Sequence, residues 1–171
     1  MSQLQLCCPV RQYETVGRVS LLQDVGVNVE VKMATSGALP ETPQQEVCRV
    51  VDPIVKVLVQ CAGQRQLYVS SFDPDIVKAV SWHRKEGRLV SLPRLSLWFL
   101  TAGGSQQHAD SRRMSVAAAV TFATETAIDG IVSETEVARQ QRLDVGAALE
   151  SGLKVSYTTC RPAKTHTQGV G

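Results

Sequence analysis

The sequence lacks several features that would assign it to a broad class of protein. Its 171 residues contain no apolar run of the roughly 18 residues that a membrane-spanning helix needs. The first residues do not show the charged and then apolar plan of a signal peptide. The net charge is only +2, and no basic block or aromatic-interleaved basic stripe is present. We therefore expect no membrane span, no nucleic-acid partner and, by default, a cytoplasmic location.

The cysteine pattern argues against a disulfide-bonded extracellular protein. The chain has five cysteines, an odd number, and none forms a C-x-x-C pair. Free thiols in a reducing compartment are the simplest interpretation. Cys7 and Cys8 are adjacent, but no histidine or second cysteine pair lies at zinc-site spacing from them. With 43% hydrophobic and 20% charged residues, the composition is typical of one globular domain with a sizeable core.

What the sequence does contain is a strictly alternating stretch at residues 27–32, VNVEVK. Valines that alternate with polar residues predict a β-strand. The period of two places Asn28, Glu30 and Lys32 on one face and the valines on the other. This pattern leaves two interpretations open. The strand could be half-exposed and antiparallel with a solvated polar face, or it could lie at the mouth of a barrel, where Glu30 binds a metal and Lys32 a phosphate group.

Predicted strands and helices alternate along the rest of the chain. The patterns predict further strands at 67–72, 95–100, 128–134 and 153–157, and helices at 44–61, 75–85, 115–126 and 136–152. Asp73 and Pro74 fit the N-cap and first position of the second helix. Pro53 predicts a kink or a break in the first. Residues 1–20 and 160–171 show no clear period, although 15–23 would suit a short helix or an approach loop.

This order indicates an α/β fold with about five βα units. Strands that are separated by helices rather than by tight hairpins form parallel sheets with right-handed crossovers. A complete eightfold barrel needs roughly 250 residues. The chain is therefore either a small open doubly wound domain or a piece of a barrel.

The residues at the strand ends carry a resemblance to a known family. They are 28–32 (NVEVK), 70–75 (SSFDPD), 99–104 (FLTAGG) and 130–134 (GIVSE). In order and spacing this set resembles the glycerophosphodiester phosphodiesterases, and 112–115 (RRMS) and 130–134 are most similar to plant-type members. The resemblance covers about residues 26–157. It implies a partial TIM-type (β/α) barrel and a single partial domain over residues 1–171.

The resemblance also implies a reaction and the residues that take part in it. Members hydrolyse glycerophosphodiesters, such as glycerophosphocholine, to glycerol 3-phosphate and an alcohol, and use a divalent cation, Mg²⁺ or Ca²⁺. Position by position, Glu30 matches a metal-binding carboxylate, and Lys32 matches the catalytic lysine that contacts the phosphate. Tyr157 matches an aromatic residue that lines the mouth. Ser71 and Phe72 lie at a predicted strand end on the expected catalytic face, and we expect them to contact substrate.

The chain departs from the family pattern upstream of Glu30. The family's His-Arg, Glu-x-Asp and His-Asp pairs, which supply the acid and base and complete the metal site, have no counterpart there. His83-Arg84 falls within a predicted helix, and we expect His108 and His166 to be solvated. We therefore expect a fragment truncated at both ends, an incomplete cation site and no activity of the chain alone.

Other interpretations concern partners and alternative chemistry. Open sheet edges would allow self-association. The chain would then be a non-catalytic pseudoenzyme or interaction module derived from this fold. Another barrel enzyme could use Lys32 as a Schiff-base nucleophile, although Glu30 on the same face opposes the depressed lysine pKa that this chemistry needs. Glu134, also at a predicted strand end, shares the expected catalytic face.

Overall fold

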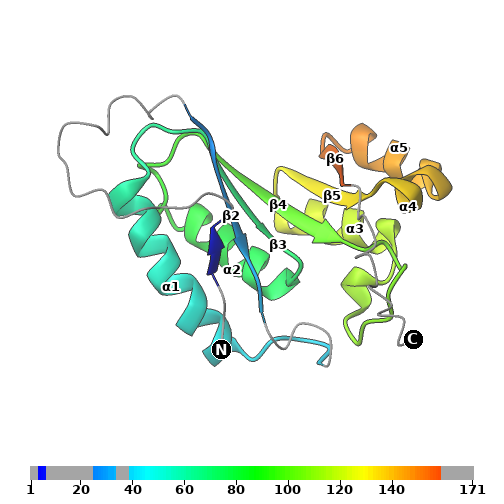
Figure 1. Cartoon of the computed structure of the whole chain (residues 1–171), viewed down its shortest axis with the longest axis horizontal. Coiled ribbons are helices and arrows are strands. Elements are labelled where there is room, and N and C mark those ends of the chain that lie inside the picture. Colours follow the sequence, from blue (N-terminus) through cyan, green and yellow to red (C-terminus); the bar gives the residue numbers. More distant parts are fainter. Residues whose placement is uncertain (1–3, 7–24, 34–38, 159–171) are drawn as a thin grey trace, which may run out of the picture.

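The computed structural model describes residues 4–6, 25–33 and 39–158, which form one six-stranded sheet with helices (Figure 1). The strands cross the sheet in chain order, and β2 to β6 are parallel, whereas β1 pairs with β2 antiparallel. This confirms an α/β fold with five parallel strands in an open sheet, consistent with a partial TIM-type barrel. The strands are β1 (Leu4–Leu6), β2 (Val27–Val31), β3 (Leu67–Ser71), β4 (Leu95–Thr101), β5 (Gly130–Glu134) and β6 (Lys154–Thr158).

Each parallel step passes through at least one helix, which brings the chain back to start the next strand in the same direction. Asp73 caps α2 as predicted, because its carboxylate accepts the backbone N–H groups of Asp75 at 2.9 Å and Ile76 at 3.3 Å. Ser115 caps α3 in the same way through the Ala118 N–H at 3.0 Å. The helices are α1 (Gln44–Cys61), α2 (Pro74–Lys85), the 3₁₀-helix η2 (Ser111–Arg113), α3 (Val116–Thr126), α4 (Thr135–Gln140) and α5 (Arg142–Glu150).

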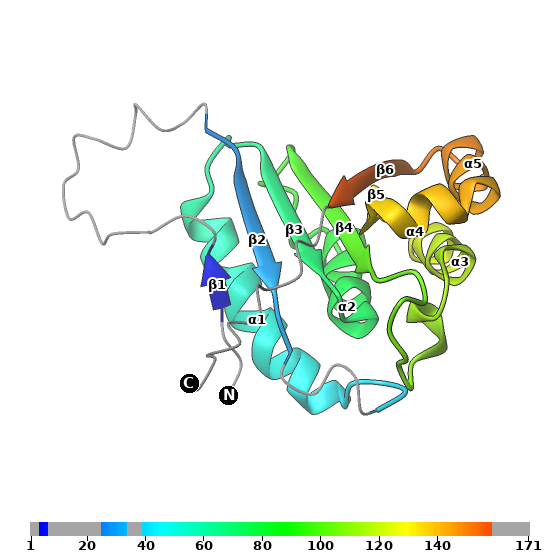
Figure 2. The same ribbon diagram turned by 45° about the vertical axis from the view of Figure 1, so that its right-hand side comes forward.

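The hydrophobic core lies between the sheet and the helices (Figure 2). β2 contributes Val29 and Val31, which are 4% and 2% exposed and confirm the predicted apolar face of this strand. The rings of Phe99 and Phe122 meet edge to face with centroids 5.0 Å apart. One continuous apolar cluster therefore packs one face of the sheet and leaves the other face available for a site.

Two helix predictions need correction. The predicted break at Pro53 is wrong, because α1 runs without interruption through this residue. Pro53 lies on the exposed face of the helix, away from the buried face that packs on the core. The helix predicted at 136–152 is two helices, divided at Gln141. The Gln141 side chain donates to the Gly103 carbonyl at 2.8 Å and accepts the Val116 N–H at 2.9 Å, so tertiary contacts occupy the residue at the break.

Strand β1 was not predicted, because three residues are too few to show a period. It covers the β2 edge of the sheet, and β6 forms the other edge. The expectations for residues 15–23 and 160–171 lie outside the described residues. None of the helices in the described ranges is long and apolar enough to cross a membrane.

Candidate active site

Alternate side chains of β2 to β6 point away from the core and line a concave surface, which we call the strand hollow. Its volume is about 490 Å³. The strand register places Glu30 beside Ser70, Ser70 beside Trp98, and Trp98 beside Gly130. The lining contains both polar and apolar side chains, and every parallel strand contributes to it: Asn28, Glu30, Tyr68, Ser70, Phe72, Trp98, Leu100, Thr101, Val132, Glu134, Ser156 and Thr158.

Glu30 and Lys32 lie at the carboxyl end of β2, which ends at Val31. The Lys32 Nζ is 3.6 Å from the Glu30 Oε1. The Glu30 side chain is only 17% exposed, whereas that of Lys32 is 48% exposed. The Glu30 carboxylate therefore lines the hollow, and the Lys32 ammonium group, which is not among the lining residues, stands beside it on the more exposed side. In parallel α/β sheets, the carboxyl ends of the strands are where sites form.

Besides Lys32, three residues were predicted to contact substrate, and the structure places them differently. Phe72 lines the strand hollow. Ser71 does not, because its hydroxyl is buried on the core side, where it donates to the Val31 carbonyl at 2.7 Å and accepts the Asp73 N–H at 3.0 Å. Tyr157, which we expected at the mouth, is not among the residues that line the strand hollow. Tyr157 pairs with the buried Ser133, so it lies on the helix-facing side of β6, and its neighbours in the strand face the hollow instead.

Further residues of the hollow were not singled out from the sequence. Trp98 lies in a largely apolar strand without clear alternation, so the side of the sheet that it occupies became evident only from the positions of the neighbouring strands. Glu134 does line the hollow, as its strand-end position suggested, and the Ser105 hydroxyl donates to it at 3.4 Å. Glu30 and Glu134 are three strand spacings apart, roughly 14 Å along the sheet. One cation cannot bind both carboxylates across that separation.

Neither described histidine lines the strand hollow. His83 lies within α2, as predicted, and its Nε2 is 3.3 Å from Asp52 Oδ1 of α1. The expectation that His108 is solvated is wrong for its ring, because both ring nitrogens are buried and have no hydrogen-bond partner in the described part of the chain. Burial, together with the charge of Arg113, lowers the pKa of His108 below its ordinary value, against the opposing effect of Asp110. His166 lies outside the described residues.

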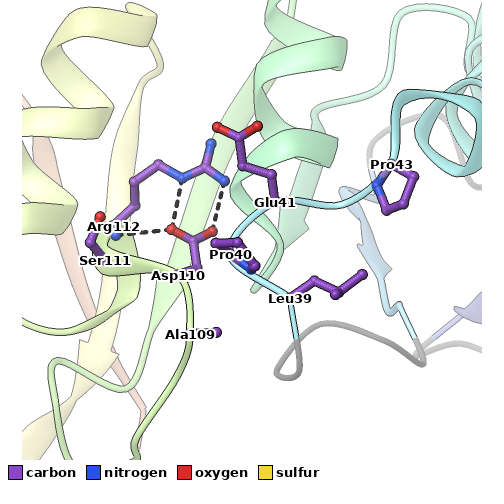
Figure 3. A pocket seen from close by; sticks show the side chains of 8 residues that line it. All are labelled: Leu39, Pro40, Glu41, Pro43, Ala109, Asp110, Ser111 and Arg112. Carbon is purple, nitrogen blue, oxygen red and sulfur yellow. Dashed lines mark hydrogen bonds and ion pairs between the residues drawn. The ribbon is translucent and has the colours of Figure 1, made fainter.

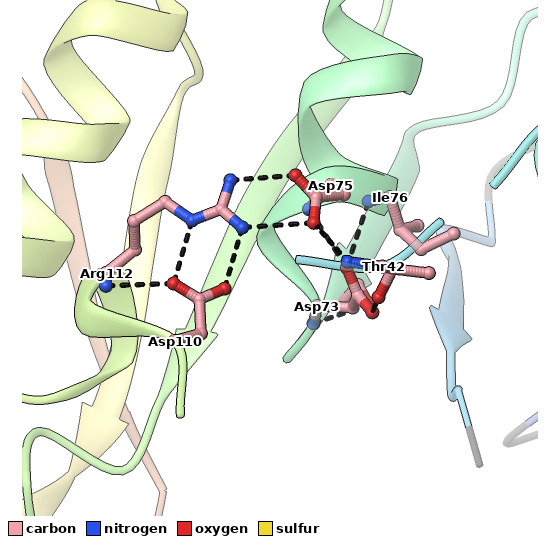
Figure 4. A network of polar contacts seen from close by, with 7 residues as sticks. Thr42, Asp73, Asp75, Ile76, Asp110 and Arg112 are labelled. Carbon is pink, nitrogen blue, oxygen red and sulfur yellow. Dashed lines mark hydrogen bonds and ion pairs between the residues drawn. The ribbon is translucent and has the colours of Figure 1, made fainter. Parts of the chain in front are cut away.

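A network of five side chains, which we call the loop clamp, joins the connections that follow β2, β3 and β4 (Figure 4). Arg112 binds Asp110 through Nε at 2.8 Å and Nη2 at 2.7 Å. It also binds Asp75 through Nη1 at 2.7 Å and Nη2 at 3.0 Å. Thr42 completes the network, because its N–H donates to Asp75 at 2.8 Å and its hydroxyl donates to Asp73 at 2.5 Å.

The loop clamp raises the pKa of Arg112. Burial acts to lower the pKa of this guanidinium, but the hydrogen bonds to Asp110 and Asp75 outweigh burial and hold the pKa above its ordinary value. Arg113 behaves differently: burial lowers its pKa, and the charges of Asp73 and Asp110 only partly oppose the effect. Sequence reasoning noticed Arg112 only through the family resemblance, because its carboxylate partner Asp75 is 37 residues away.

A second cavity, of about 670 Å³, lies between two of the clamped connections (Figure 3). Leu39, Pro40, Glu41 and Pro43 line it on the side that precedes α1. Residues 109–112 line the opposite side, and Arg112 forms part of that wall. Arg112 and Asp110, which line this cavity, also belong to the loop clamp.

Comparisons with known proteins agree with the residues at the strand ends. The family model described as "Glycerophosphoryl diester phosphodiesterase family" matches residues 3–168, a wider range than the motifs alone indicated. The chain is 30% identical over 138 residues to the glycerophosphocholine phosphodiesterase gde1 of Schizosaccharomyces pombe. It is 30% identical over 113 residues to the chloroplastic glycerophosphodiester phosphodiesterase GDPD1 of Arabidopsis thaliana, and 27% identical over 133 residues to GDPD2 of the same plant.

These matches cover most of this chain but a minor part of each relative. They include 77%, 66% and 78% of the present sequence, respectively. They span only 11% of the yeast protein and 28% and 33% of the two plant proteins. No solved structure matches the chain significantly.

Proposed function

Because the chain belongs to the glycerophosphoryl diester phosphodiesterase family, we propose that it supplies the Glu30–Lys32 part of a site that hydrolyses glycerophosphodiesters to glycerol 3-phosphate and an alcohol. The observation that carries this proposal is the placement of the two side chains. They stand 3.6 Å apart at the carboxyl end of β2, with Glu30 in the wall of the strand hollow. The continuous core from β2 to β5 supports treating the chain as a single domain.

Each of the two side chains has a role that its chemistry supports. The Lys32 ammonium would neutralise negative charge on the phosphoryl oxygens as it develops in the transition state. Its 48% exposure leaves it accessible to a substrate. Phe72 is also exposed in the hollow and would pack against the carbon atoms of the glycerol.

Glu30 would be one ligand of a divalent cation, since enzymes of this family generally depend on such a cation. Calcium and magnesium prefer several oxygen ligands. Among the residues that the structure describes, no cluster of three or more His, Cys, Asp or Glu side chains could hold a metal ion. Glu134 is too far across the sheet to share an ion with Glu30. The described residues therefore do not by themselves fit a divalent cation, and Mg²⁺ or Ca²⁺ would need further oxygen ligands.

We expect the chain alone to show no measurable turnover. General acid and base groups each contribute about 10² to 10⁴ in rate, and neither His83 nor His108 lines the hollow. Binding of the product should survive, because it needs Lys32 more than it needs a proton donor. The proposal therefore predicts weak binding of glycerol 3-phosphate without catalysis.

Two measurements on the same protein test this proposal. An NMR titration with glycerol 3-phosphate should perturb residues around Lys32, and Lys32→Ala should abolish that response, whereas Lys56→Ala on the exposed surface of α1 should not. Release of glycerol 3-phosphate from glycerophosphocholine should stay at background with Mg²⁺, with Ca²⁺ and with chelator. Absence of any binding by the wild type would refute the site.

Metal-dependent release would instead refute the expected inactivity. In that case Glu30→Gln should abolish release, and Glu46→Gln, which alters an exposed carboxylate of α1, serves as the matched control. Loss of release in both variants would show that Glu30 has no special role.

A further inference from the structure

We propose that Arg112 is a positioning residue that holds the β2–α1 and β4–α3 connections at a fixed separation along the carboxyl edge of the sheet. This inference deepens the proposed function and rests on it for its relevance to substrate. Both connections carry groups of the candidate site. Lys32 opens the first, and Ser105, which donates to Glu134 in the strand hollow, belongs to the second.

The Arg112 guanidinium makes two hydrogen bonds to each of two carboxylates, a geometry that a single ammonium charge could not provide. Four N–H groups reach four carboxylate oxygens, two on Asp75 and two on Asp110, at 2.7 to 3.0 Å. A guanidinium can make both paired contacts because its donors are fixed in one plane. A lysine at this position would keep the charge but could not span both carboxylates in this way.

The two carboxylates that Arg112 binds lie in different strand-to-helix connections, and Asp75 also binds a residue of a third connection. Asp75 lies in the first turn of α2, and its Oδ2 also accepts the Thr42 N–H, so it ties the segment before α1. Asp110 is the N-cap of η2, where its Oδ1 accepts the Arg112 N–H at 3.0 Å. One guanidinium thus links three successive strand-to-helix connections.

The charges around Arg112 favour the state in which it joins the connections. The side chains of Asp75 and Asp110 are 15% and 8% exposed, and Asp73 is buried beside them. Without Arg112, three poorly hydrated carboxylates would face one another across the cavity wall, and like charges at short range repel. Removal of the guanidinium should therefore move the connections apart rather than only loosen one of them.

The β4–α3 connection is compact enough to transmit this constraint to the hollow. A Cβ atom on Gly104, whose φ is +92°, would lie 2.5 Å from the Met114 carbonyl oxygen. The outgoing limb of the connection, near Ser105, therefore packs directly on the returning limb, near Met114. Gln141 holds the base of both limbs through its contacts with Gly103 and Val116.

Amide hydrogen exchange of the full chain tests the inference. In Arg112→Ala and also in Arg112→Lys, exchange in residues 39–43 and 103–113 should accelerate by about tenfold or more, because charge-assisted hydrogen bonds are lost. The matched control is Arg84→Ala. It removes a comparable ion pair, 2.6 Å from Asp129, at the amino edge of the sheet, and should leave both segments unchanged once exchange is compared at equal global stability.

Wild-type exchange in Arg112→Lys would overturn the inference, because charge alone would then suffice. Equal acceleration in Arg84→Ala would also overturn it, since it would show a general loss of stability. On the same samples, the dissociation constant for glycerol 3-phosphate should rise at least fivefold in Arg112→Lys. Failure of the proposed function would appear separately, as absence of binding by the wild type, and the exchange comparison would still decide the role of Arg112.

Discussion

Replacing Gly130 with alanine should disturb both the sheet and the strand hollow. A Cβ atom there would lie 2.4 Å from the Lys154 carbonyl oxygen, and 2.7 and 2.9 Å from two carbon atoms of the Trp98 ring. Trp98 can move, because its side chain faces the hollow. The Lys154 carbonyl is part of the β5–β6 pairing, so it can move only if β6 shifts. The contact therefore tests whether β6 is held as tightly as the structure shows.

The expected change in the free energy of unfolding of Gly130→Ala follows from two opposing effects. Overpacking typically costs about 1–3 kcal/mol, and about 0.5 kcal/mol is recovered because alanine is less flexible than glycine in the unfolded chain. A net loss of roughly 0.5–2.5 kcal/mol is expected from these terms. Gly146, within α5, has no atom within 4 Å of such a Cβ. Gly146→Ala should therefore stabilise the protein by about 0.5–1 kcal/mol.

Thermal and urea unfolding, followed by circular dichroism, measure this difference. The two variants should differ by roughly 1–3.5 kcal/mol, or about 2–14 °C in Tm for a domain of this size. In a Trp82→Phe background, emission from Trp98 reports the hollow directly, and it should shift to longer wavelength in Gly130→Ala. Equal stability of the two variants, with unchanged emission, would refute the close packing of β5, β6 and Trp98.

Two further substitutions test the carboxyl edge of the sheet. Asp73→Ala should lower the free energy of unfolding by about 1–2 kcal/mol, because N-caps contribute in that range and because Asp75, Ile76 and Thr42 lose their shared acceptor. Asp73→Asn should lower it clearly less. Equal losses in the two variants, measured by urea unfolding, would contradict the capping role. The pKa of His108 is lowered in the folded state. At a pH near or below about 6.5, the ordinary pKa of histidine, the unfolded chain therefore binds more protons than the folded chain does. Stability should therefore fall as the pH drops through 6.5 toward the folded pKa, and His108→Gln should show a smaller difference between urea midpoints at pH 7.5 and 5.5; an unchanged difference would exclude this histidine as the cause.

Much of the fold was predictable because it is encoded locally. The alternation at residues 27–32 assigns Glu30 and Lys32 to one face and the valines to the core, since side chains of a strand alternate by stereochemistry. Asp73 and Pro74 mark the start of α2 because the cap contacts lie within a few residues. The alternating order of strands and helices was also predictable. It indicates a parallel sheet, because the connections between strands are long enough to contain a helix.

Tertiary structure decided the features that depend on contacts between distant residues. Gln141 divides a predicted helix because it binds Gly103 and Val116, which no local pattern reveals. Tyr157 faces the helices because of its pairing with Ser133, and a register of this kind is set only when neighbouring strands meet.

The loop clamp is the clearest example of such a feature. Arg112 and Asp75 are 37 residues apart, and each would read as an ordinary exposed charge in the sequence. The sequence by itself determined the order and approximate position of β2 to β6 and of most helices, and which face Glu30 and Lys32 occupy, because those properties arise largely from neighbouring residues. Only folding brought together Arg112, Asp75, Asp110 and Thr42, because ion-pair partners are chosen by distance in space.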